Sequence, residues 1–72
     1  MNATDRARRK VEVLDAFVRL VRSGAITAND AARRLRVDPE TVRVWLAGGS
    51  LPSGRRVDDL ARLVESLRES EK

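Results

Sequence analysis

The side chains that could do chemistry in this chain are arginines, and the most informative one shares a helix face with apolar residues. The spacing i, i+3, i+4, i+7 is found at Glu40, Arg43, Val44 and Ala47, which places all four residues on one side of a helix. An arginine can contact O6 and N7 of guanine, and small apolar side chains can contact the methyl group of thymine. The chain has no Cys and no His, so common nucleophile–base pairs and most zinc sites are excluded. The pattern predicts recognition of base edges, with no enzyme activity, metal or cofactor.

The element that must position this face is a short helix beginning at Pro39. Asp38 suits the N-cap, and Pro39 suits the first helical position, where the missing N–H costs nothing. Val42, Trp45 and Leu46 form a second stripe on the opposite side, and helical periodicity favours the core for that stripe. A short helix with two organised sides is expected to pack with one and contact a partner with the other.

A second short helix precedes this one. Thr27 is its predicted N-cap, and Arg36 with Val37 makes the turn that follows it. Its apolar stripe consists of Ala28, Ala31, Ala32 and Leu35. Because three of these four residues are alanines, another helix backbone can approach closely. Helix, turn and helix over residues 27–47 form the arrangement that places a recognition helix in a DNA major groove.

A long helix is predicted before this motif, over residues 4–22. Thr4 is a possible cap, and Gly24 suits the position just after the helix. Two adjacent apolar stripes cover about half of its circumference. The first contains Val11, Leu14, Val18 and Val21, and the second contains Val13, Phe17 and Leu20. Such a wide apolar face is expected to be buried by more than one partner, for which the other helices of the monomer suffice.

A further helix is predicted after the motif, over residues 54–69. Ser53 is its expected cap, Leu51 is expected to plug the core from the preceding loop, and residues 66–72 are expected to fray. The chain is therefore predicted to form a single all-α domain over residues 1–72. Its fold is a small bundle of about four helices containing a helix-turn-helix.

The charge of the chain is unevenly distributed. The 72 residues carry a net charge of +4, with 12 basic and 6 acidic side chains in residues 1–56, against 3 and 5 in residues 57–72. The basic part contains the motif, which is favourable for a polyanionic partner. Several basic residues begin helices, where the helix dipole disfavours them, or project outward from the first motif helix. They are interpreted either as solvated or as contacts to DNA phosphates: Arg6, Arg8, Arg9, Lys10, Arg33, Arg34, Arg55 and Arg56.

The sequence contains no recognisable membrane-spanning segment or signal peptide. No apolar run approaches the length of a membrane span, and no signal peptide precedes the first helix. We therefore expect a soluble, cytoplasmic protein that acts at the nucleoid of a bacterial or phage-infected cell.

Residues 26–64 resemble the phage repressor/Cro-like (Xre-type) helix-turn-helix family. The resemblance is carried by Ala32, Val37, Asp38-Pro39-Glu40-Thr41-Val42, Trp45, Gly48, Leu51-Pro52-Ser53, Leu60 and Ala61. The shorter run over residues 32–52 is also similar, more weakly, to excisionase and MerR-type proteins. Those proteins continue into a β-hairpin wing, whereas Pro52 here leads almost directly into a helix.

The resemblance implies a set of DNA contacts. The expected base-reading residues are Pro39, Glu40, Arg43, Val44 and Ala47. The expected phosphate contacts are Thr27, Ala28, Arg36, Thr41, Arg55 and Arg56. The chain departs from the family pattern where Ala28 replaces a frequent Gln, where Arg36 replaces a frequent Gly, and where Asp38 and Glu40 bring acidic groups to the groove end of the helix.

The expected function is sequence-specific binding of double-stranded DNA by a small transcriptional regulator that occupies an operator. A homodimer is expected, with surplus apolar surface on the two long helices as its interface: Val13, Phe17, Leu20, Leu63 and Leu67. No membrane partner and no small-molecule substrate are expected. Two alternatives stay open: an excisionase- or transposase-like recombination accessory, and an antitoxin-like or host-takeover module that binds protein instead of DNA.

Overall fold

Four helices, joined by short loops, make up the structure. The computed structural model describes residues 3–70, and that range contains no strand. The helices are α1 Ala3–Arg22, α2 Ala28–Leu35, α3 Pro39–Leu46 and α4 Gly54–Ser70. The predicted all-α bundle of about four helices is therefore confirmed, and both long helices lie within one residue of their predicted bounds.

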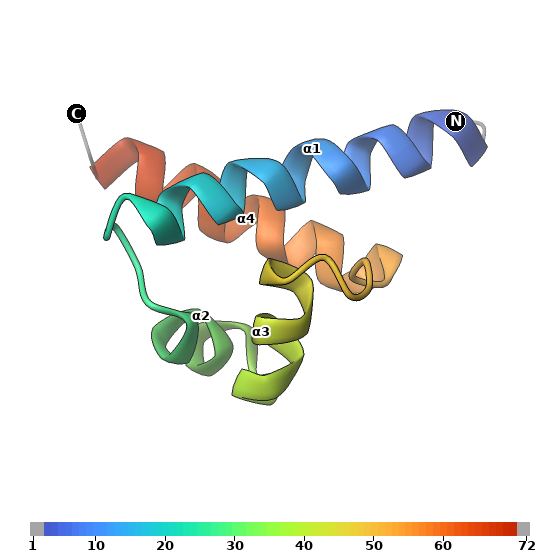
Figure 1. The fold of residues 1–72 in the computed structure, drawn as a ribbon. Helices are drawn as coiled ribbons and strands as arrows, with labels where there is room; N and C mark the ends of the chain where they lie inside the picture. Colours follow the sequence, from blue (N-terminus) through green and yellow to red (C-terminus); the bar gives the residue numbers. More distant parts are fainter. Residues whose placement is uncertain (1–2, 71–72) are drawn as a thin grey trace.

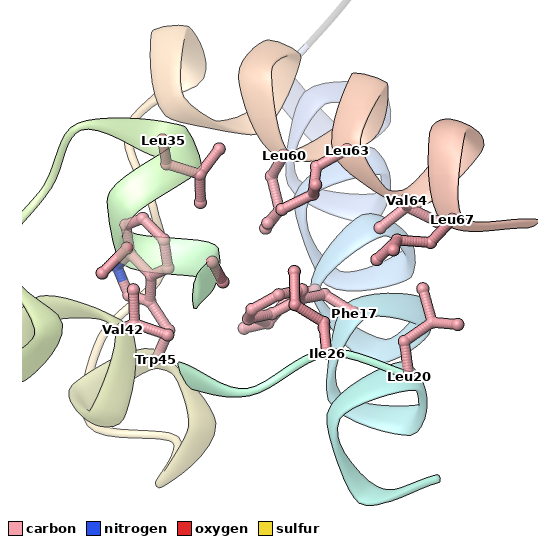
Figure 2. Close-up of a cluster of buried hydrophobic side chains, with 13 residues drawn as sticks. Phe17, Leu20, Ile26, Leu35, Val42, Trp45, Leu60, Leu63, Val64 and Leu67 are labelled. Atoms are coloured by element: carbon pink, nitrogen blue, oxygen red, sulfur yellow. The ribbon is translucent and has the colours of Figure 1, made fainter. Parts of the chain in front are cut away.

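The helices pack as two pairs. The long helices α1 and α4 lie side by side, while α2 and α3 pack against each other on one side of that pair (Figure 1). Side chains from all four helices meet between the pairs: Phe17 from α1, Val42 from α3 and Leu60 from α4 are completely buried. Figure 2 shows these side chains converging, with Ile26 contributed by the loop before α2. The core therefore fixes the motif helices onto the α1–α4 pair.

Left-handed residues end the helices at the positions that the sequence indicates. Gly24 has φ +85° after α1, and Gly48 has φ +79° after α3. Beyond each glycine, a backbone N–H reaches back to the helix, from Ala25 to Leu20 O at 3.0 Å and from Gly49 to Val44 O at 2.9 Å. This closure satisfies carbonyl groups that a helix end leaves unpaired.

Three predictions about side chains and ends were wrong. Thr4 lies inside α1 and does not cap it. Leu51 is 51% exposed and plugs nothing, because the neighbouring Pro52 occupies the buried position in that loop. The end of α4 does not fray from residue 66 onward, since the helix continues to Ser70 and Leu67 is buried in the core. Residues 71 and 72 lie outside the described range.

The apolar surface expected to form a dimer interface is used within the monomer. Phe17 and Leu20 of α1, and Leu63 and Leu67 of α4, are all buried, and Val13 is half-buried against the same core. The helices α1 and α4 pack against each other and against the motif helices, and this packing buries their apolar faces except at Val11, which is 54% exposed. The predicted location of a dimer interface was therefore wrong.

Candidate nucleic-acid interface

Helix α3 presents two different sides. The Asp38 carboxylate accepts a hydrogen bond from the Glu40 N–H at 2.8 Å, and Pro39 opens the helix, as the sequence predicts. Val42 and Trp45 point into the core, where Trp45 retains only 4% exposure (Figure 2). The four residues of the opposite side are all exposed: Glu40, Arg43, Val44 and Ala47. The predicted faces of this helix are correct.

An ion pair lies across the exposed face of α3. Nη1 of Arg43 is 3.4 Å from Oε2 of Glu40, one turn earlier. The two side chains are 58% and 73% exposed, so the pair contributes little to stability and opens readily to solvent or a ligand. Glu40 thus keeps the Arg43 guanidinium near the exposed face, where it remains accessible to a ligand.

Val44 gives the exposed face an apolar surface. Its side chain is 36% exposed and is bordered by Gly49, where an added Cβ atom would lie only 3.1 Å from Val44 Cγ1. The close approach of the Gly48–Gly49 turn therefore covers one side of Val44 and leaves the other open. Neither Val44 nor Ala47 belongs to the core cluster.

The start of α2 is capped by its own threonine. Oγ1 of Thr27 accepts a hydrogen bond from the Asp30 N–H at 3.1 Å, so part of its bonding capacity is already used. Ala28 is half-buried against the core and has no polar side chain. At this end of α2 a phosphate would meet backbone N–H groups, which a helix leaves unpaired in its first turn. Thr41 is exposed in the first turn of α3.

Arg36 ends α2 in a conformation that usually favours glycine. Its backbone has φ 59° and ψ 44°, and the N–H of Val37 closes the turn on Ala32 O at 3.0 Å. A left-handed arginine costs about 1–2 kcal/mol relative to glycine. The left-handed turn considered from the sequence is therefore present, with an exposed cationic side chain at the strained position.

The two arginines at the start of α4 have different environments. Nη1 of Arg56 donates to the carbonyl oxygen of Leu35 at 3.1 Å and lies 4.0 Å from Oδ2 of Asp59. This guanidinium therefore joins α4 to the end of α2, a structural role that the sequence did not reveal. Arg55 is exposed and forms no ion pair with any residue in 3–70.

Helices α2 and α4 bring several arginines into one groove. The groove has a volume of about 610 Å³ and is lined by Arg34 and Arg36 from the end of α2 and by Arg55, Arg56 and Arg62 from α4. We call this set of five residues the arginine groove. The sequence indicated Arg36, Arg55 and Arg56, but it favoured ordinary solvated charge for Arg34 and did not single out Arg62. Only the packing of α4 beside α2 shows that they share a surface.

The basic start of α1 lies against α4. Nη1 of Arg9 is 2.6 Å from Oδ1 of Asp58, 49 positions along the chain. Arg6, Arg9 and Lys10 line a depression of about 440 Å³ beside Gly54 and Asp58. The basic segment over residues 6–10 is thus helical, and Arg9 ties it to the start of α4. Its cationic groups extend the basic surface around that helix end.

Comparison with known proteins identifies no family and no relative for this chain, since no family model, curated protein or solved structure matches it. Among the described residues, no helix combines the length and apolar character needed to cross a membrane.

Proposed function

We propose that the chain is a small transcriptional regulator that binds double-stranded DNA sequence-specifically, with α3 in the major groove. The observation that carries this proposal is the exposed side of α3. Arg43, Val44 and Ala47 contribute nothing to the core, yet their spacing places them on a single face of the helix. A major groove admits one α-helix, and these residue types match what base edges offer there.

The proposed readout assigns a different contact to each side chain. Arg43 donates to O6 and N7 of a guanine, and Val44 and Ala47 contact thymine methyl groups. Glu40 lies beside Arg43 and orients its guanidinium before binding. On DNA, Glu40 accepts a hydrogen bond from a cytosine amino group or keeps its contact with Arg43. Pro39 begins the helix at the groove end and completes the base-reading set.

Phosphate contacts flank this helix in the proposed complex. Thr27 and Ala28 offer backbone N–H groups at the start of α2, and Thr41 offers a hydroxyl at the start of α3. Arg36 and Arg55 supply exposed cations on either side of α3 in the sequence. Arg56 supports this surface through its bond to Leu35 and is not proposed as a direct contact.

Regulation in this proposal is by occupancy of an operator. A homodimer on DNA is proposed because one short recognition helix limits both affinity and site length. Its interface must lie outside the buried faces of α1 and α4. The proposed place of action is the cytoplasm, at the nucleoid. A recombination accessory would use the same DNA contacts in a different biological event. Residues 47–53 join α3 to α4 without a strand, so no β-hairpin wing follows α3.

The experiment that tests the proposal is selection of bound sequences from a library of random duplex DNA. We expect enrichment of a palindrome with half-sites about 10 bp apart, or roughly 34 Å. Enrichment of a single unrepeated site, with a monomer on it in sedimentation, would remove the dimer from the proposal. No enrichment over the input library would refute sequence-specific binding altogether.

Binding of a protein partner through α3 is the second candidate function. Two observations favour it: Asp38 and Glu40 place carboxylates at the end of α3 that would enter the groove, and Val44 and Leu51 are exposed apolar residues. The two functions differ in their response to salt, because neutralising phosphates gives log K a linear dependence on log salt concentration. Absence of salt-dependent binding to any duplex would favour the protein partner.

A further inference from the structure

The arginine groove contains far more positive than negative charge. Five guanidinium groups line it, and Asp59 is the one acidic residue among its lining residues. That carboxylate lies 4.0 Å from Arg56, which also bonds to Leu35 O. Arg34, Arg36, Arg55 and Arg62 form no ion pair with any other residue in 3–70. Gathering unpaired like charges in a concave surface opposes folding, and an anion in the groove reverses that effect.

The shape of the groove suits a chain of anions better than a single one. Arg55 and Arg62 are seven residues apart on α4, which corresponds to about 10 Å along the helix axis. One strand of DNA carries a charge about every 3.4 Å of helix axis, so a row of this length lying parallel to the DNA axis spans about three steps from one phosphate to the next. Arg34 and Arg36 supply cations from the opposite wall, at the end of α2.

We propose that the arginine groove binds the phosphodiester backbone of DNA, which adds Arg34 and Arg62 to the DNA-binding surface. This inference rests on the proposed function, since it takes DNA as the ligand. The four groove cations other than Arg56 are arginines, whose planar guanidinium groups can donate two parallel hydrogen bonds to one phosphate. Arg36 precedes α3 and Arg55 follows it, so the groove contains the residues that flank, along the chain, the helix proposed to read bases.

Arg56 has a positioning role in this groove. Its bond to Leu35 O fixes the start of α4 against the end of α2, and those two segments form the walls. Arg34 and Arg62 have no such bond among the described residues and are exposed, so their guanidinium groups are free to turn toward phosphate. They are the residues whose removal tests the groove with least effect on the fold.

The test measures binding of a labelled duplex of arbitrary sequence as a function of salt, using the full chain. The variant is Arg34→Gln with Arg62→Gln, and the control is Arg19→Gln with Arg68→Gln. The control pair removes the same charge from a separate depression, which Glu12 and Asp15 also line and which shares no lining residue with the groove. If each groove arginine neutralises one phosphate, the slope of log K against log salt becomes shallower by about 1.8 in the groove variant. The affinity lost between about 50 and 200 mM salt then shrinks roughly twelvefold.

The control variant should keep the parental slope. Equal changes in both double variants would show a general effect of net charge and would overturn the proposal. A parental slope in the groove variant would also overturn the proposal. This holds even if the groove binds a small polyanion such as tripolyphosphate, because the groove would then not bind DNA. Replacing both residues by Lys should preserve the slope, which checks that charge, and not misfolding, causes the effect.

The outcome separates this inference from the proposed function. A parent chain that selects a defined sequence, with an unchanged slope in the groove variant, keeps the proposed function and refutes the groove. A parent chain that selects no sequence, with the expected loss of slope, keeps the groove as a backbone-binding site and refutes sequence-specific regulation.

Discussion

Nη1 of Arg56 donates a hydrogen bond to the carbonyl oxygen of Leu35, 3.1 Å away and 21 positions earlier in the chain. Arg56 lies in the first turn of α4, and Leu35 is the last residue of α2. A cation at a helix C-terminus interacts favourably with the helix dipole, so the contact combines a hydrogen bond with a favourable charge. One partly buried side chain therefore helps to hold the helix-turn-helix against the α1–α4 pair.

Replacing Arg56 by Ala should lower the free energy of unfolding by about 1.5 kcal/mol, the lower range for a hydrogen bond to a charged group. For a domain of this size, that corresponds to a decrease in Tm of about 6–12 °C. Arg55→Ala is the matched control, because Arg55 is exposed; its stability should stay within about 0.5 kcal/mol of the parent. Thermal and urea unfolding followed by circular dichroism measures both. Equal stability of the two variants would show that the Arg56 contact does not stabilise the fold.

Trp45→Ala should be far more damaging. Trp45 is 4% exposed and packs in the shared core, and truncating a large buried aromatic costs about 3–5 kcal/mol. That approaches the whole stability of a small domain. Val44→Ala, on the next residue but on the exposed side, should cost less than about 1 kcal/mol. If Trp45→Ala instead unfolds within a few degrees of the parent, the assignment of the two faces of α3 is reversed.

Local sequence signals predicted most of the helix ends, although not the start of α1, because caps act over a few residues. Thr27, Asp38 and Ser53 all accept hydrogen bonds from the first turns of their helices. Gly24 and Gly48 both take the left-handed conformation. These interactions span two to five positions, so they are visible in a single stretch of sequence.

Local signals could not predict contacts between residues far apart in the sequence. Arg9 pairs with Asp58, and Arg56 with Leu35 O, across 49 and 21 positions, and nothing local marks either partner. Arg62 resembles any solvated residue on a polar strip until α2 lies beside it. The choice between Leu51 and Pro52 for burial depends on the path of the loop, which hydropathy alone does not determine. The DNA contacts themselves stay predictions.

Arg36→Gly should separate strain from binding. Glycine relieves a left-handed cost of about 1–2 kcal/mol but loses about 0.5–1 kcal/mol through its freer unfolded chain, so stability should rise by about 0.5–1 kcal/mol. If Arg36 contacts phosphate, affinity for all duplexes should fall in the same variant. Arg36→Ala keeps the strain and removes the charge, so it should lose affinity without gaining stability. Denaturant unfolding and salt-dependent DNA binding measure the two effects separately; unchanged affinity in both variants would remove Arg36 from the phosphate contacts.

The exposed side of α3 provides the most direct test of readout. Arg43→Ala should cost about 1–3 kcal/mol of discrimination at one base pair of the selected operator, because a bidentate contact to guanine is lost. Val44→Ala should cost less, at a neighbouring position where a thymine methyl group is no longer covered. Both residues face away from the core, so unfolding should change little. The measurement is competition binding across single-base variants of that operator.

Glu40→Gln distinguishes the two roles proposed for the carboxylate next to Arg43. If Glu40 contacts only Arg43, across the 3.4 Å ion pair, Glu40→Gln removes a negative charge near DNA and should raise affinity for every duplex. Base preferences should then stay intact, because the Gln amide oxygen can still accept a hydrogen bond from Arg43. If Glu40 accepts a hydrogen bond from cytosine, Glu40→Gln should weaken discrimination at one C·G pair.

Parental base preferences in Arg43→Ala and Val44→Ala would show that this face does not read bases. Parental affinity in both as well would place the face away from DNA, and binding of a protein partner would then explain its exposed arginine and valine better.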